Sequence, residues 1–319
     1  MISAKKFFRL LLEQRQHSAK MVSTRRAERA RAAAVAWSKL SGDEQGIIVG
    51  QLRNALEPRL VMYFSSASKE LWSLLPPAAQ QQLRADYEEA TALCRKMGMR
   101  NCKELREATR VDWHERGLSE ADLATLVTLG PVLPALDWLT LVETSGTAGP
   151  DGVQRLAEGL VADALPALTY LLIGGMHVGD AGASEFAAAL DRGALPRLKD
   201  LRLCTAIGDA GLAALAPALR RHRALESLSL WSNPLGDEGL AALVAPPPPA
   251  GTPPPPAGGL KKLEVLDLGH TQITDAGCAT LVAALDSGAL PALKELELQG
   301  TPASFAATVA VYKALAKRK

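Results

Sequence analysis

The sequence has few aromatic residues and few cysteines, and it contains no long apolar run. Aromatic residues make up 4% of the 319 residues, although 48% of the residues are hydrophobic, so leucine and alanine must fill any core. No apolar run approaches the length of about 18 residues that a membrane-spanning helix needs, and no signal-peptide core precedes a cleavage site. The cysteines, which suit a reducing compartment and form no CxxC pair, are Cys94, Cys102, Cys204 and Cys278.

Recognisable catalytic and cofactor motifs are also missing. Neither a GxxxxGK[ST] nor a GxGxxG phosphate loop occurs, and no His/Cys cluster has metal-ligand spacing. His177, His222 and His270 have no Ser or Cys partner at the spacing of a nucleophile and its base. We therefore expect a protein that is not an enzyme and that uses no metal and no cofactor.

Charge is unevenly distributed along the chain. Residues 1–116 contain 21 Lys/Arg and 13 Asp/Glu (about +8), whereas residues 117–319 contain 15 and 21 (about −6).

One short phrase, Leu-x-x-Leu-x-Leu or Ile, occurs six times in the second part of the chain. Its copies begin at Leu136, Leu168, Leu198, Leu225, Leu263 and Leu293, with steps of 32, 30, 27, 38 and 30 residues. A recurring period of this size indicates a solenoid. Within each phrase the alternation predicts a β-strand with one apolar face.

A second pattern recurs between the phrases: an apolar residue, an Asp two places later and then a Gly. The Asp of each copy can accept backbone N–H bonds at a helix start, and an apolar stripe at helical spacing follows. Each predicted helix ends at a Gly/Pro turn such as 193–196. The four copies of the pattern are 178–182, 207–211, 235–239 and 273–277.

One strand and one helix in about 30 residues cannot bury their own apolar face, but stacked copies can. Residues from about 118 to 319 resemble leucine-rich repeat proteins of the ribonuclease-inhibitor-like class. The resemblance implies an α/β fold: a curved solenoid with a parallel sheet inside and helices outside. Family repeats often carry Asn three residues after the phrase. Only Asn233 does so here, with Met176 and Thr271 in equivalent places, so we expect no Asn ladder.

If the leucines of each phrase face the core, the residues between and just after them face the concave side. This alternation and the family resemblance select the same candidate protein-binding residues. Trp231 is the best single anchor among them, because exposed Trp, Tyr and Arg dominate interface energies. The candidates are Trp138, Thr140, Val142, Tyr170, Leu172, Asp200, Arg202, Ser227, Ser229, Trp231, Val265, Asp267, Glu295 and Glu297.

Two domains are expected. Residues 1–107 form a basic helical module, in which 77–97 is strongly helical and Gly98 ends the helix. Residues 108–319 form the repeat domain, with a degenerate first repeat at 108–135 that the helical module covers. Three interpretations of segment 1–40 remain open: a solvated helix, an organelle-targeting peptide, or a contact with an acidic surface, RNA or anionic lipid.

The 38-residue step contains a proline-rich loop insertion at 246–257. Such a run favours polyproline II, and it is either a tolerated loop expansion or a ligand for a proline-binding domain.

The sequence as a whole predicts a non-catalytic scaffold or adaptor that binds a protein partner through the concave face. The alternative is a regulator of a small GTPase, because the class resembled includes Ran GTPase-activating proteins and Arg202 is the only concave arginine. We expect an intracellular, most simply cytoplasmic protein that binds no nucleic acid. It is expected to be a monomer or a member of a larger complex.

Overall fold

The computed structural model describes residue 35 and residues 77–130, 133–144, 149–160, 164–176, 178–244 and 260–318. The chain divides into two compact units, Met1–Lys103 and Glu104–Lys319. Apart from Val35, segment 1–40 lies outside the described residues, as do the proline-rich insertion 246–257 and His177.

The described part of the first unit is dominated by helix α6, Pro77–Lys96. Its C-terminus has the hydrogen bonds of a Schellman motif: the N–H of Met99 donates to the carbonyl of Cys94 at 2.8 Å, and that of Gly98 donates to Arg95 at 3.0 Å. Gly98 has a φ of +73°, which a residue without a side chain adopts readily. The helix therefore ends where the sequence predicts. Helix α7, Cys102–Glu107, follows.

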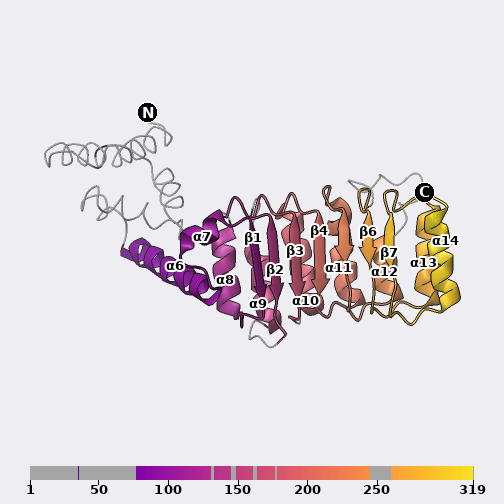
Figure 1. The fold of residues 1–319 in the computed structure, drawn as a ribbon, viewed down its shortest axis with the longest axis horizontal. Helices are drawn as coiled ribbons and strands as arrows, with labels where there is room; N and C mark the ends of the chain where they lie inside the picture. Colours follow the sequence, from indigo (N-terminus) through magenta and orange to yellow (C-terminus); the bar gives the residue numbers. More distant parts are fainter. Residues whose placement is uncertain are drawn as a thin grey trace. The chain divides into compact units, whose positions relative to one another are not determined.

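The second unit contains a parallel sheet of seven strands that follow one another in chain order, as Figure 1 shows. Each strand pairs in register with the next, so that Leu139 lies beside Leu171 and Leu171 beside Leu201. The strands are β1 Arg110–His114, β2 Trp138–Val142, β3 Tyr170–Gly174, β4 Asp200–Cys204, β5 Ser227–Ser229, β6 Val265–Asp267 and β7 Glu295–Glu297.

A helix follows every strand, and consecutive helices pack against each other along the sheet (Figure 1). They are α8 Glu120–Leu129, α9 Gly149–Gly159, α10 Gly179–Asp191, α11 Asp209–Arg221, α12 Asp237–Val244, α13 Asp275–Asp286 and α14 Phe305–Ala316. This arrangement confirms the predicted α/β repeat solenoid. Segment 108–135, predicted as a degenerate first repeat, contains β1 and α8.

The core lies between the sheet and the helices and is made of the leucines of the repeated phrase. Leu201, Leu228 and Leu266 are fully buried in neighbouring strands, as are Leu215 and Leu281 on the helices. Burying a leucine side chain contributes roughly 1.5–3 kcal/mol, so the stacked rows supply the main driving force for folding. Strands β1 and β7 alternate between exposed and buried residues, so at both ends of the sheet the face opposite the core is accessible to solvent or a partner.

The recurring Asp stabilises the start of the helix in the following repeat. Oδ1 of Asp180 accepts from the N–H of Gly208 at 2.7 Å, and Oδ1 of Asp275 accepts from that of Ser304 at 2.6 Å. Gly208 and Ser304 are the N-cap residues of α11 and α14. A carboxylate at a helix N-terminus bonds an otherwise unpaired donor and interacts favourably with the helix dipole. The sequence predicted a cap but not that it links two repeats.

The Gly of the same pattern allows adjacent repeats to approach closely. A Cβ on Gly239 would stand 2.7 Å from Oδ1 and 3.0 Å from Cα of Asp209 in the preceding repeat. A Cβ on Gly211 would likewise stand 2.9 Å from Cα of Asp180. The Asp of one repeat and the Gly of the next therefore act together in stacking the repeats, since the Asp carboxylate occupies the space in which a side chain at the Gly would lie.

Asn233 performs the cross-repeat bonding that the family assigns to an Asn ladder, and it does so at one repeat. Its Oδ1 accepts from the N–H groups of Thr205 and Ile207 at 3.1 and 2.9 Å. Its Nδ2 donates to the carbonyls of Leu203 and Leu230 at 2.6 and 2.7 Å. At the equivalent position after β6, the Thr271 hydroxyl bonds only within its own repeat, to Leu268 at 2.7 Å.

Glu143 takes over part of this role near the start of the sheet. Its Oε1 accepts from the N–H groups of Arg116 and Leu118 at 2.7 and 3.0 Å, which are donors in the preceding repeat. The turns after the strands are thus bonded by different side chains, in agreement with the sequence. Within the described residues, no helix has the length and apolar character to cross a membrane.

Candidate interaction surface

The face of the sheet opposite the core leucines, here called the open face, presents residues from every strand in register. One row across the sheet contains Arg110, Trp138, Tyr170, Asp200, Ser227, Val265 and Glu295. The next row contains Asp112, Thr140, Leu172, Arg202, Ser229, Asp267 and Glu297. The two rows contain every candidate binding residue taken from the sequence except Val142, at the end of β2, and Trp231, which follows β5.

The N-terminal half of the open face carries a ladder of cations and aromatic rings. The rings of Trp138 and Tyr170 are stacked, with centroids 3.4 Å apart and planes 7° from parallel. Cζ of Arg110 lies 4.3 Å from the Trp138 centroid, and Cζ of Arg202 lies 5.3 Å from that of Tyr170. Contacts of this kind contribute about 0.5–1 kcal/mol at exposed sites. Only 7% of the surface of Tyr170 is exposed.

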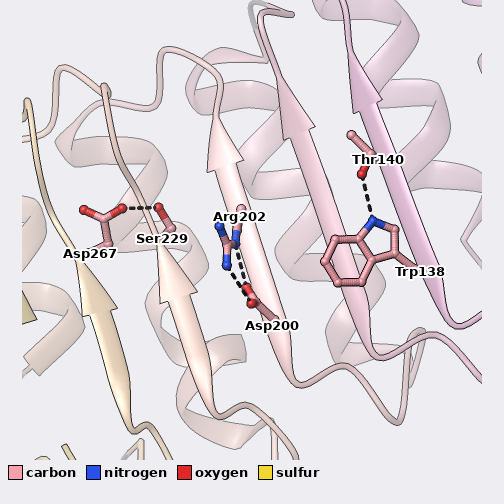
Figure 2. Close-up of polar contacts among 6 residues, drawn as sticks. All are labelled: Trp138, Thr140, Asp200, Arg202, Ser229 and Asp267. Atoms are coloured by element: carbon pink, nitrogen blue, oxygen red, sulfur yellow. Dashed lines mark hydrogen bonds and ion pairs between the residues drawn. The ribbon is translucent and has the colours of Figure 1, made fainter. Parts of the chain in front are cut away.

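Hydrogen bonds hold two members of this ladder, Trp138 and Arg202, as Figure 2 shows. Nε1 of Trp138 donates to Oγ1 of Thr140 at 3.1 Å. Arg202 donates through Nε and a terminal nitrogen to the two carboxylate oxygens of Asp200, at 3.1 and 3.0 Å. This bidentate hydrogen bond raises the pKa of Arg202 above its ordinary value. The ladder is thus pre-organised in the free protein.

The position of Arg202 bears on the alternative of a GTPase regulator. Its guanidinium is engaged by Asp200 two residues away on the same strand and lies against Tyr170. An arginine finger needs a guanidinium that can reach a bound nucleotide. The geometry gives no support to that role.

Trp231 is the most exposed predicted anchor, with 44% of its surface accessible. Its ring meets that of His270 edge to face, with centroids 5.3 Å apart and planes at 71°. The indole lies over the backbone of Gly269, where a Cβ would approach its Cδ1 to 2.9 Å. A glycine there lets a large ring rest on the sheet while much of it stays in solvent.

Strands β6 and β7, which follow β5 in the sheet, carry carboxylates. Asp267 accepts from the Ser229 hydroxyl at 2.7 Å (Figure 2) and from the N–H of Gly269 at 3.0 Å. Oε1 of Glu297 accepts from the N–H groups of Leu298 and Gln299 at 3.1 and 2.9 Å. Glu295 and Glu297 are both exposed. This half of the face is therefore acidic.

The predicted residues divide into those that a partner can touch and those that support them. Thr140, Tyr170 and Ser229 are buried, so they position Trp138, Arg202 and Asp267. Leu172, Ser227 and Val265 are half-buried between the strands. The exposed or partly exposed residues that remain are Trp138, Val142, Asp200, Arg202, Trp231, Asp267, Glu295 and Glu297.

The sequence list missed Arg110 and Asp112, which extend both rows into β1. The degenerate phrase at Ala108 contains the signal, because Arg110 stands two places after Ala108 as Trp138 stands two places after Leu136. His270 was also missed as the neighbour of Trp231, since it follows the strand in a turn.

Burial shifts the pKa of two further titratable side chains of the second unit, Cys204 and His222. Burial raises the pKa of the Cys204 thiol, which favours its neutral form. Burial likewise lowers the pKa of His222, whose Nε2 lies 3.0 Å from the carbonyl of Leu195. Within the described residues, no group of three His, Cys, Asp or Glu side chains is placed to hold a metal ion.

Comparison with known proteins agrees with the repeats seen here. The family model described as Leucine Rich repeat matches residues 200–216, 222–244 and 259–282. These three stretches are therefore similar to leucine-rich repeats, as the resemblance implied. No curated protein matches the sequence. One similar solved structure is an internalin (InlF) from Listeria monocytogenes, at 11% identity over 70% of this chain and 92% of that chain. Its TM-score of 0.23 is too low to inform the function of this chain.

Proposed function

We propose that this protein is a non-catalytic scaffold or adaptor that binds a protein partner through the open face of its repeats. The observation that carries the proposal is the exposed ring of Trp231, which is held on the sheet by Gly269 and His270 in the same face as the Trp138–Tyr170 stack. Trp, Tyr and Arg are the residues in which interface energy concentrates. Open solenoid faces are also the usual contact surface of repeat proteins.

Pre-organisation supports this proposal further. Trp138 and Arg202 already occupy fixed positions through Thr140, Tyr170 and Asp200. These side chains would therefore lose little conformational entropy when a partner binds. Ordering a flexible side chain on binding costs about 0.5–1.5 kcal/mol.

A comparison of two exposed aromatic residues tests the proposal. Tagged full-length protein would be captured from cells as wild type, Trp231→Ala and Phe305→Ala. Phe305 is 85% exposed and lies at the start of α14, away from the open face. We expect specific partners to be lost with Trp231→Ala, since hot-spot truncation costs about 2 kcal/mol or more. They should be retained with Phe305→Ala. Equal recovery from both variants would place the binding site elsewhere, provided that both melt like wild type.

We also propose finer features that are consistent with this role. The repeats are of the ribonuclease-inhibitor-like kind, because an α-helix follows each strand from β1 to β7. The domains are 1–107 and 108–319. The protein works inside the cell, since Cys94, Cys102, Cys204 and Cys278 are all free thiols. A fluorescent fusion, with and without residues 1–40, would test the location and any targeting role of that segment.

A further inference from the structure

The open face is electrically asymmetric, and its cations are already paired. Arg110 lies 3.9 Å from the carboxylate of Asp112, and Arg202 lies 3.0 Å from that of Asp200. Strands β5, β6 and β7 read SLS, VLD and ELE, so β6 and β7 contribute carboxylates and none of the three contributes Lys or Arg. The two halves of the face therefore present different chemistry to a partner.

Among the described residues, the carboxylates of β6 and β7 form no ion pair with a lysine or arginine, although the charge of Arg202 acts on Asp267 from two strands away. Asp267 and Glu297 accept only neutral donors, from Ser229 and from backbone N–H groups. Lys294, which directly precedes Glu295 in the sequence, forms an ion pair with Glu264, with 2.7 Å between Nζ and Oε2. Since Glu295 and Glu297 are also exposed, their negative charge is available to a partner.

Trp231 lies beside these carboxylates. A Cβ on Gly269 would meet Cδ1 of Trp231 at 2.9 Å and Oδ1 of Asp267 at 3.2 Å, so the indole and the carboxylate flank the same point of the backbone. A lysine or arginine side chain suits this pair, because its cation is attracted to both the face of an indole and a carboxylate. His270 is the other titratable group at the ring, and it meets the ring at its edge.

We propose that Trp231, Asp267, Glu295 and Glu297, here called the acidic end, bind the Lys or Arg side chains of a basic, extended segment of the protein partner. The proposal rests on the function proposed above and adds the chemistry of the partner. Phosphate-bearing partners such as nucleic acids and anionic membranes are disfavoured, because the exposed carboxylates repel them.

The spacing of the acidic end favours an extended chain. Glu295 and Glu297 are two residues apart on β7 and point to the same face. Residues i and i+2 of an extended chain are about 6.6 Å apart. A segment with basic residues at alternate positions, running along β7, would therefore bring one cation to each glutamate. Adjacent strands lie about 4.8 Å apart, so Asp267 and Trp231 are within reach of long side chains from the same segment.

Peptide binding to the full-length protein tests the proposal directly. The probes are a fluorescent Lys-Ser repeat peptide and a Glu-Ser repeat peptide of equal length, followed by fluorescence anisotropy at low and physiological salt. The test variant is Glu295→Gln/Glu297→Gln, which keeps side-chain size and removes two charges. The matched control is Glu238→Gln/Asp286→Asn, which removes two charges from exposed positions on helices α12 and α13. A Trp231→Leu variant removes the ring.

We expect the Lys-Ser peptide to bind wild type and the control equally, with affinity that falls as salt rises. The Glu295→Gln/Glu297→Gln variant, which loses two charge-assisted contacts, should weaken binding by about tenfold or more, and Trp231→Leu, which loses one cation–π contact, should weaken it by about two- to fivefold. No binding at low salt, equal binding of the Glu-Ser peptide, or equal loss in the control would overturn the proposal. The scaffold function would still stand if Trp231→Ala abolished partner capture while the Lys-Ser peptide failed to bind.

Discussion

The carboxylate of Asp209 accepts a hydrogen bond from the backbone N–H of Gly239, one repeat further along the chain, at 2.9 Å. The same oxygen accepts from the N–H of Gly236 at 2.6 Å. Equivalent contacts run from Asp180 to Gly208 and from Asp237 to Thr274. The stack is thus joined by the sheet, by the leucine core and by a third line of bonds along the helix starts.

Adding one methyl group at Gly239 should destabilise the repeat domain. Its Cβ would stand 2.7 Å from Oδ1 of Asp209, so the carboxylate must move and weaken its bonds. We expect Gly239→Ala to lower the free energy of unfolding by about 1–3 kcal/mol, the usual cost of overpacking, measured by urea denaturation. Helix propensity alone predicts a gain of about 1 kcal/mol, so a more stable variant would show that the close approach is unimportant.

A double-mutant cycle identifies the partner in this contact. Asp209→Ala alone should cost about 1–2 kcal/mol, because the start of α12 loses its acceptor. In the Asp209→Ala background, Gly239→Ala should cost much less than it does in wild type, since the carboxylate is gone. Additive effects would indicate that Gly239→Ala acts on some other neighbour.

Asn233→Ala should be among the more damaging polar substitutions. The residue is 2% exposed and its amide joins Thr205 and Ile207 to Leu203 and Leu230. Leaving buried backbone groups unpaired costs about 1–3 kcal/mol each, so a loss of about 3 kcal/mol is reasonable. Thr271→Val, which removes one bond within a single repeat, is the control and should cost about 1 kcal/mol. Similar losses in thermal or urea unfolding would argue against a special role for Asn233.

The sequence predicted the strands and the face to which each strand residue points, but it predicted the contacts between repeats only in part. The phrase starting at Leu136 and that starting at Leu168 place Trp138 and Tyr170 at the same position, so alternation and register put them side by side. Whether the rings stack depends on their rotamers, which alternation does not specify. Burial of Tyr170 likewise depends on residues that pack around it from other strands.

The sequence pattern also did not predict which backbone N–H groups donate to the recurring Asp. The sequence marks Asp209 as a helix-start residue, but the N–H groups of its own helix and of the next one are equally plausible donors. The structure selects Gly236 and Gly239, because Gly239 leaves room for the carboxylate. The cross-repeat hydrogen bonds of Glu143 could not be predicted from the sequence, since Glu143 stands one place before the position that family repeats fill with Asn.

Releasing Arg202 should loosen the aromatic ladder. Asp200→Asn removes the charge that holds the guanidinium through two bonds, of 3.1 and 3.0 Å. We expect a small loss of stability, about 0.5–1 kcal/mol, because the pair is partly exposed. We also expect a weaker near-ultraviolet circular dichroism signal from the Trp138–Tyr170 stack. Glu226→Gln, which breaks the exposed pair with Lys199, is the control and should leave that signal unchanged.

The first unit contains a thiol that should titrate well below the ordinary range. The hydrogen bond from Cys94, with smaller contributions from Thr91 and the charge of Arg95, lowers the pKa of Cys102 to about 6 against the opposing effect of burial. Oγ1 of Thr91 lies 3.6 Å from its Sγ. Hydrogen bonds to a thiolate favour the charged form. Because the pKa is lowered on folding, the thiolate stabilises the folded unit at high pH, and this contribution is lost as pH falls through about 6.

Thiolate ultraviolet absorbance, taken as the difference between wild type and Cys102→Ser, should therefore rise with a midpoint near pH 6. Thr91→Val removes one hydrogen bond to the thiolate, so it should shift this midpoint upward. Thr128→Val, whose hydroxyl donates to the Ala124 carbonyl on α8, should leave the midpoint in place. A wild-type midpoint close to the ordinary value of 9.0 would mean that Cys94 and Thr91 do not stabilise the thiolate, and Cys102 would then be a neutral core residue.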